Sequence, residues 1–264
     1  MVDTLLTSID ERGVATVTLN RADVHNAFND DLIWELNNAF TKLGANDDVR
    51  AIVLTGAGKS FSAGADLNWM KEAASYTEEQ NMRDALTLSG MLSTLNSCPK
   101  PTIAIVNGAT FGGGVGLVSC CDVAIAVEDA KFSLSEVRLG LTPATISPYV
   151  VAAIGSRAAR RYFLTAERFD AFEARRIGLV HEIAPTLQEA FSRAHVFLKN
   201  ILAGAPTAQK EAKDLIFAVT DREITDGLRT DTARRIAERR ASDEGREGLS
   251  AFLEKRKPVW SVDA

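Results

Sequence analysis

Cysteine and histidine are scarce in this chain of 264 residues, with three of each. The cysteines, Cys98, Cys120 and Cys121, lack CxxC spacing, and we interpret them as reduced, buried thiols. The histidines are scattered along the sequence and form no HExxH pair. The sequence therefore predicts neither a disulfide framework nor a metal site.

A long apolar run and an excess of basic charge are also missing. No apolar stretch approaches the roughly 20 residues that cross a bilayer, and the N-terminus lacks the basic and apolar segments of a signal peptide. The formal net charge is −5, whereas nucleic-acid and anionic-membrane partners usually require a basic face. We therefore expect a cytoplasmic protein that binds neither nucleic acid nor a membrane.

Most of the chain alternates between strand and helix patterns. Strands are predicted as a hairpin at 4–9 and 14–20 and as further runs at 50–54, 102–106, 122–127, 131–137 and 178–183. Helices are predicted at 30–43 with Asp30 as N-cap, and at 67–74, 77–95, 156–164 and 171–177. This alternation predicts an α/β fold with parallel strands and helical crossovers. From residue 187 onward only helices are predicted, so a subdomain boundary is expected near 185–205.

A glycine-rich turn, Asn107–Leu117, connects the apolar run Thr102–Val106 to a predicted helix. Its consecutive glycines leave backbone N–H groups uncovered at the positive end of a helix dipole. This arrangement suits a ligand oxygen that develops negative charge. The alternative is a closely packed strand-to-helix turn without a ligand, and the turn alone does not decide between the two.

A second loop of small residues, Phe61–Leu67, precedes a short predicted helix. Nucleotide-binding motifs fail here, because a P-loop would need glycine at Val53 and a dinucleotide fingerprint would need it at Phe61. The loop can be explained by packing and capping alone. It can also expose the Ala65 N–H opposite that of Gly113, and two convergent donors would form an oxyanion hole.

Glu136 is a single carboxylate within an apolar stretch, Phe132–Gly140. It can be a solvent-facing residue or a partner of Arg138, as most glutamates are exposed. If it is partly buried, its pKa rises and it becomes a usable proton shuttle near neutral pH.

With these three elements in this order, the chain resembles the enoyl-CoA hydratase/isomerase (crotonase) superfamily over nearly its whole length. The motifs that carry the resemblance are Asn20–Phe28, Phe61–Leu67, Asn107–Gly114, Cys121-Asp122, Phe132–Gly140 and Phe252–Pro258. The resemblance implies a spiral of ββα units, residues 1–195, that holds the acyl-CoA site. It also implies a helical oligomerisation region, residues 196–264, and a homotrimer or a hexamer made of two trimers.

The same resemblance implies roles for individual residues. The backbone N–H groups of Ala65 and Gly113 would hold the thioester oxygen, and Glu136 would be the catalytic acid/base. Coenzyme A would be carried as part of the substrate, without a separate cofactor. Its contacts would come from the loops that contain Val24, Ala27, Ala63, Asp66 and Leu67, and from Phe252 and Lys255 of a neighbouring subunit.

One position departs from the family pattern. Hydratases of the familiar type have a second glutamate just after the glycine turn, where this chain has Gly116. A lone Glu136 can activate water if other groups hold that water, or it can move a proton between two carbons, as in the enoyl-CoA isomerases of the family. A binding protein without catalytic activity is a third possibility.

The stretches 135–149 and 160–168 look closest to bacterial methylglutaconyl-CoA hydratases. The sequence thus favours hydration of a branched 2-enoyl-CoA, such as 3-methylglutaconyl-CoA, in acyl-CoA catabolism. It does not fix the acyl group, the groups that hold the water, or the choice between trimer and hexamer.

Overall fold

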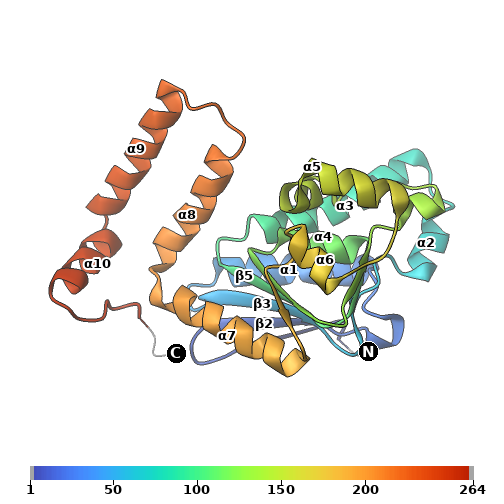
Figure 1. Ribbon diagram of the computed structural model, residues 1–264, viewed down its shortest axis with the longest axis horizontal. Coiled ribbons are helices and arrows are strands. Elements are labelled where there is room, and N and C mark those ends of the chain that lie inside the picture. The colour runs from blue at the N-terminus through green and yellow to red at the C-terminus, as the bar shows by residue number, and fades with distance from the viewer. Residues whose placement is uncertain (1–2, 262–264) are drawn as a thin grey trace.

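The computed structural model describes residues 3–261 and contains two β-sheets covered by helices (Figure 1). The larger sheet has the strand order β1-β2-β3-β5-β7-β10, with bounds Leu5–Ile9, Val14–Leu19, Ala51–Gly56, Thr102–Val106, Val123–Val127 and Glu182–Ala184. The smaller sheet has the order β4-β6-β8-β9, with bounds Ser60–Ser62, Ala109–Phe111, Lys131–Ser133 and Phe169–Asp170. The pairs β1–β2 and β8–β9 are antiparallel, and the other pairs of described strands are parallel.

From β3 to β8, successive strands alternate between the two sheets. The pairs β3–β4, β5–β6 and β7–β8 each supply one strand to the larger sheet and the next to the smaller one. Each pair is followed by helical structure: α2 (Leu67–Ala73) and α3 (Glu78–Asn96), then α4 (Gly113–Cys120), then η2 (Glu136–Leu139) and α5 (Ser147–Thr165). The predicted α/β spiral of ββα units is therefore confirmed.

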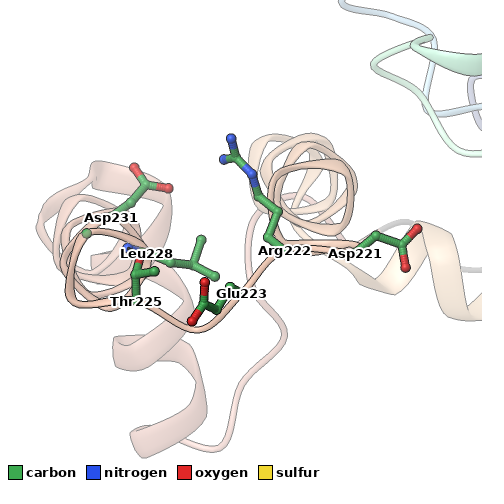
Figure 2. A pocket seen from close by; sticks show the side chains of 7 residues that line it. Asp221, Arg222, Glu223, Thr225, Leu228 and Asp231 are labelled. Carbon is green, nitrogen blue, oxygen red and sulfur yellow. Dashed lines mark hydrogen bonds between the residues drawn. The ribbon is translucent and has the colours of Figure 1, made fainter.

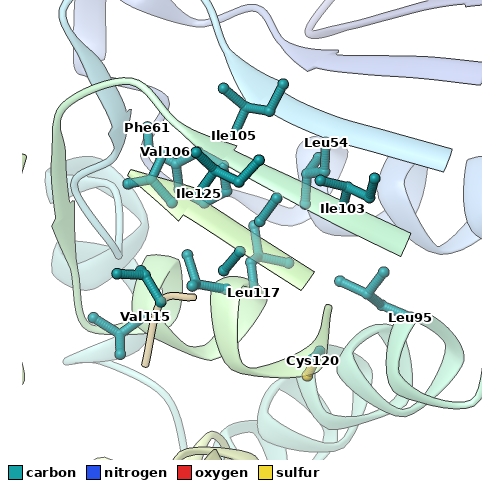
Figure 3. Close-up of a cluster of buried hydrophobic side chains, with 14 of the residues drawn as sticks. Leu54, Phe61, Leu95, Ile103, Ile105, Val106, Val115, Leu117, Cys120 and Ile125 are labelled. Carbon is teal, nitrogen blue, oxygen red and sulfur yellow. The ribbon is translucent and has the colours of Figure 1, made fainter. Parts of the chain in front are cut away.

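The hydrophobic core lies between the larger sheet and the helices that cover it. The apolar runs of β3 and β5 are buried at every position, as expected for parallel strands covered on both faces. Figure 3 shows Leu117 of α4 directed toward these strands, and Val115 and Ile105 belong to the same buried cluster. The glycine-rich turn is thus anchored from behind, because α4 begins at that turn and is almost wholly buried.

Four local predictions are wrong at their boundaries. The strand predicted at 178–183 is β10, which covers only Glu182–Ala184. Helix α1 (Asp30–Ala45) is capped by Asn29, whose side chain accepts the Leu32 N–H, and not by Asp30. The strand predicted at 131–137 ends at Ser133, and Glu136 begins the short 3₁₀ helix η2. The helix predicted at 156–164 belongs to the longer α5, which continues across a break at Gly155 (φ 73°).

The remaining elements form the edge of the core and a helical arm. Near the core are η1 (Ala22–Val24), α6 (Ala171–Arg176) and α7 (Leu187–Ala203). The arm, residues 205–253, contains α8 (Pro206–Val219), α9 (Asp226–Ala241) and α10 (Asp243–Leu253), and it projects to one side of the sheets (Figure 1). The predicted division at 195/196 falls inside α7, which buries Ala190, Ala194, Leu198 and Leu202 against the core. The chain leaves the core only after Gly204.

Polar contacts hold the base of the arm against the core. Lys213 of α8 donates to Asp122 at 2.9 Å, and its side chain is only 11% exposed. The Arg50 guanidinium donates to the carbonyl oxygens of Leu202, Gly204 and Trp260. Beyond this base the arm is exposed, since neither α8 nor α9 contains a buried residue.

Candidate active site

The three elements singled out in the sequence meet at one edge of the smaller sheet. Strands β4, β6 and β8 are parallel neighbours, so their carboxyl ends lie at the same edge. The segments that follow these strands carry Ala65, Gly113 and Glu136. The spiral thus collects residues from three successive turns, in the position where open parallel sheets usually bind ligands.

The loop of Ala65 is held by a parallel bridge to Phe28. The Phe28 N–H donates to Gly64 O at 2.6 Å, and the Asp66 N–H donates to Phe28 O at 2.8 Å. In such a bridge the intervening residue turns its own N–H and C=O to the opposite side. Ala65 is exposed, and within residues 3–261 its N–H donates to no backbone carbonyl. This donor is therefore available to a ligand.

The Gly113 N–H is available for a related reason. Gly112 precedes α4 with φ 48° and ψ −117°, a conformation that glycine permits. Its N–H donates to Ser133 O at 2.9 Å, and its carbonyl accepts from Val115 and Gly116. Gly113, at the first position of α4, is half-buried and donates to no backbone carbonyl of the described chain.

The two loops approach each other closely. A Cβ atom at Gly64 (φ 88°) would lie 3.0 Å from Phe111 O and 3.8 Å from the Cα of Gly112. Only glycine combines this backbone conformation with so close an approach. The contact brings the segment of Ala65 against the segment of Gly113.

Glu136 lies directly over the glycine turn. Its Oε1 would be 3.0 Å from a Cβ atom at Gly112. Its Oε2 is buried and has no hydrogen-bond partner among the described residues. Burial raises the pKa of this carboxyl above its ordinary value. A half-buried carboxylate with one unpartnered oxygen and a raised pKa, placed beside the glycine turn, is a candidate proton carrier.

A buried ion pair supports the Ala65 loop. Arg21 donates to Asp66 at 2.9 Å, with side chains only 17% and 7% exposed, and it also donates to Ala27 O. Asp66 in turn caps α2 by accepting the Asn68 N–H at 2.8 Å. Burial alone would raise the pKa of Asp66, but these hydrogen bonds and the guanidinium charge outweigh it and lower that pKa.

Asn26 connects Arg21 to the segment of Ala57 and Ser60 through hydrogen bonds. It is fully buried with φ 55°, and its side-chain amide donates to Ala57 O at 2.9 Å and Ser60 O at 2.8 Å. Its amide oxygen accepts the Arg21 N–H at 2.9 Å. Sequence reasoning did not assign a role to Arg21 or Asn26, although both lie within the motif Asn20–Phe28.

The residues predicted to contact coenzyme A fall into three groups. Val24 and Leu67 are exposed and Ala63 is half-buried, near the Ala65 loop. Ala27 and Asp66 are 5% and 6% exposed, so their side chains support the loops from within. Phe252, 80% exposed, and Lys255 lie on or after α10, far from α2 and α4 in Figure 1. Within one chain the structure does not bring this last pair to the site.

Two surface hollows lie away from this edge of the sheet. One of about 480 Å³ is at the tip of the arm, between α8 and α9, and Figure 2 shows the acidic residues Asp221, Glu223 and Asp231 in its lining together with Arg222. The other, about 710 Å³, lies along α5 and α6 and is lined by four arginines, two of which pair with Glu173.

Within residues 3–261, no group of three or more acidic, histidine or cysteine side chains is placed to hold a metal ion. The helices of the same region include none that could cross a membrane.

Known proteins resemble this chain along nearly all of its length. The family model for enoyl-CoA hydratase/isomerase matches residues 10–263. A short-chain-enoyl-CoA hydratase of Clostridium acetobutylicum is 33% identical, with 94% of both chains covered. The crystal structure of an enoyl-CoA hydratase from Shewanella pealeana is 45% identical with a TM-score of 0.94, covering 97% of this chain and 96% of the other. The structure of Pseudomonas aeruginosa AtuE is 39% identical, also with a TM-score of 0.94, over 98% of this chain and all of the other.

Proposed function

The chain belongs to the enoyl-CoA hydratase/isomerase family, and on that basis we propose that it hydrates a 2-enoyl-CoA thioester. This proposal is supported by the position of the segments of Ala65, Gly113 and Glu136 at one edge of the smaller sheet, where the first two N–H groups donate to no backbone carbonyl of the described chain. Two donors aimed at the thioester oxygen stabilise the enolate more than the neutral carbonyl. Loss of one such donor costs about 2.7–4 kcal/mol of transition-state stabilisation.

The proposed reaction uses Glu136 twice. Its carboxylate accepts a proton from water while the water oxygen bonds to Cβ of the substrate. The electron pair of the double bond shifts toward the thioester, and the enolate oxygen is held by Ala65 and Gly113. Protonated Glu136 then returns its proton to Cα, which restores the carbonyl. The burial that raises the pKa of Glu136 suits a group that must both accept and release a proton.

We further propose that the acyl group is branched, such as 3-methylglutaconyl. This proposal rests on the sequence likeness of residues 135–149 and 160–168 to methylglutaconyl-CoA hydratases. The test is a mass-spectrometric assay with a panel of branched and straight-chain enoyl-CoAs. A higher kcat/KM for the branched substrates supports the proposal, and a preference for straight chains contradicts it.

We also propose that the arm covers its apolar residues against other copies in a trimer or hexamer. Ile216, Phe217 and Leu253 on the arm are each at least 50% exposed. In such an assembly, Phe252 and Lys255 of one copy would contact coenzyme A bound to another. Sedimentation velocity tests the assembly, and a monomer at micromolar concentration would contradict it.

An isomerase is the second candidate, because Gly116 leaves Glu136 as the evident acid/base. Turnover in ¹⁸O-labelled water separates the two reactions, since hydration places the label in the product and isomerisation does not. Glu136→Gln should abolish either activity, whereas Glu128→Gln, at an exposed position, should leave it unchanged. Acyl-CoA binding without turnover of any substrate would instead indicate a non-catalytic binding protein.

A further inference from the structure

Gly116 has no room for a side chain. A Cβ atom at this position would lie 2.4 Å from Cγ2 and 3.0 Å from Cβ of Ile146, with Cδ2 of Leu92 at 3.6 Å. Side-chain atoms do not approach so closely, so a residue other than glycine requires Ile146 to move. Ile146 is only 2% exposed and immediately precedes α5. The place where familiar hydratases carry a second glutamate is thus filled by a buried hydrocarbon side chain.

Glu136 and Ile146 both pack beside the first turns of α4. Gly112 is the residue just before this helix, and Gly116 lies four positions further along, roughly 6 Å away along the helix axis. The Glu136 carboxylate lies over Gly112, and the Ile146 side chain lies over Gly116. One turn further along α4 from the proposed acid/base group, the neighbouring side chain is therefore apolar.

We infer that Ile146 is a specificity-determining residue whose side chain forms the wall beside Cβ of the acyl group. This inference rests on the proposed function. A carbonyl oxygen held by Ala65 and Gly113 places the thioester carbon at the N-terminal end of α4, and Glu136 must reach Cα next to it. The chain then continues along the face of α4 toward Ile146. A hydrocarbon wall there favours an alkyl substituent on Cβ over hydrogen, by about fourfold for one buried methyl group.

The first experiment measures the ratio of kcat/KM for 3-methylbut-2-enoyl-CoA to that for but-2-enoyl-CoA. Ile146→Ala should lower this ratio about fourfold or more, and Ile146→Val should lower it less. Ile52→Ala is the matched control, because Ile52 is equally buried but lies near the start of β3 in the larger sheet. An unchanged ratio in an Ile146→Ala protein that still turns over both substrates would overturn the inference.

A binding measurement separates failure of this inference from failure of the proposed function. Calorimetric titration with 3-methylbutanoyl-CoA and butanoyl-CoA requires no turnover. One outcome is that the wild-type protein hydrates no enoyl-CoA while Ile146→Ala still lowers the ratio of its affinities for 3-methylbutanoyl-CoA and butanoyl-CoA. In that case the proposed function is wrong, but the role of Ile146 beside Cβ is supported. If neither the affinity ratio nor the kinetic ratio changes, the wall is refuted whether or not the protein is a hydratase.

A second pair of variants tests whether the Ile146 side chain occupies the space that a glutamate at position 116 would need. Gly116→Glu alone should lower Tm by several degrees, because the new side chain collides with Ile146. Combining it with Ile146→Ala should raise Tm above that of Gly116→Glu, although Ile146→Ala by itself is destabilising. A double variant that is less stable than Gly116→Glu would show that Ile146 does not occupy the space of the missing carboxylate.

Discussion

Replacing Arg21 with methionine tests whether the buried ion pair holds the Ala65 loop in its catalytic position. Methionine keeps the length and much of the volume of the side chain but removes its charge and its donors. Asp66, with a side chain 7% exposed, would remain charged beside an apolar partner. The Ala27 carbonyl would lose its Arg21 donor as well.

The expected effect is large because one partner of a buried pair is left uncompensated. Removing one member of such a pair costs about 3–5 kcal/mol of the free energy of unfolding. The catalytic effect follows from the Ala65 N–H, which lies between two residues bonded to Phe28. If the loop shifts so that this donor no longer reaches the thioester oxygen, kcat should fall about 10²- to 10³-fold.

Urea unfolding followed by circular dichroism measures the stability, and steady-state hydration of the preferred substrate measures kcat. Arg83→Met is the control, because Arg83 and Glu79 form an exposed pair at 3.4 Å, with side chains 71% and 84% exposed. Such a pair contributes only about 0.3–0.5 kcal/mol. An Arg21→Met protein within about 1 kcal/mol of this control, with unchanged kcat, would refute the reasoning.

Three further predictions concern stability. Because burial raises the pKa of Glu136, the folded protein binds a proton at this carboxyl more readily than the unfolded chain does. Ionised Glu136 therefore lowers the free energy of unfolding at neutral pH, and this loss disappears below about pH 4, where the carboxyl is protonated in both states. Glu136→Gln should therefore raise Tm at pH 8 but not at pH 4 in calorimetry, and an equal gain at both would contradict this cause. Lys213→Met should lower the free energy of unfolding, measured by denaturant titration, by about 1–3 kcal/mol, because it removes the charged donor of Asp122. An effect under about 0.5 kcal/mol would mean that this contact does not anchor the arm. Gly64→Ala should cost about 1–3 kcal/mol in the same titration and reduce kcat, because φ is 88° and Phe111 O lies in the way; full activity would show that the loops tolerate separation.

The larger sheet could be predicted well from local pattern. Strands β3, β5 and β7 appear in the sequence as short apolar runs, because strands covered on both faces need hydrocarbon at nearly every position. Of the smaller sheet, only β8 was predicted, within the longer run 131–137, since β4, β6 and β8 are three residues each and too short for a periodic signal. The alternation of strands between two sheets depends on pairing between distant segments. The family resemblance predicted this arrangement, whereas the local sequence pattern did not.

The donors and the carboxylate were identified through motifs, whereas the contacts that support their loops were not. Arg21 and Asp66 are 45 positions apart and meet only in the folded chain. The buried amide of Asn26 bonds to Ala57 and Ser60, which are 31 and 34 positions away, and a local pattern cannot reveal such partners. The assigned roles of Ala65, Gly113 and Glu136 stay predictions, although the structure places their segments at one edge of the smaller sheet.

The unused N–H groups at that edge have a consequence for the amide hydrogen exchange of the resting protein. The amides of Asp66 and Gly112 are hydrogen-bonded to Phe28 and Ser133, while those of Ala65 and Gly113, each one residue away, donate to no backbone carbonyl of the described chain. Neighbouring amides in a rigid framework should therefore exchange with solvent deuterium at very different rates. A bound acyl-CoA analogue whose oxygen occupies the site would slow Ala65 and Gly113 selectively. These two signals would then report occupancy of the site without any chemical turnover.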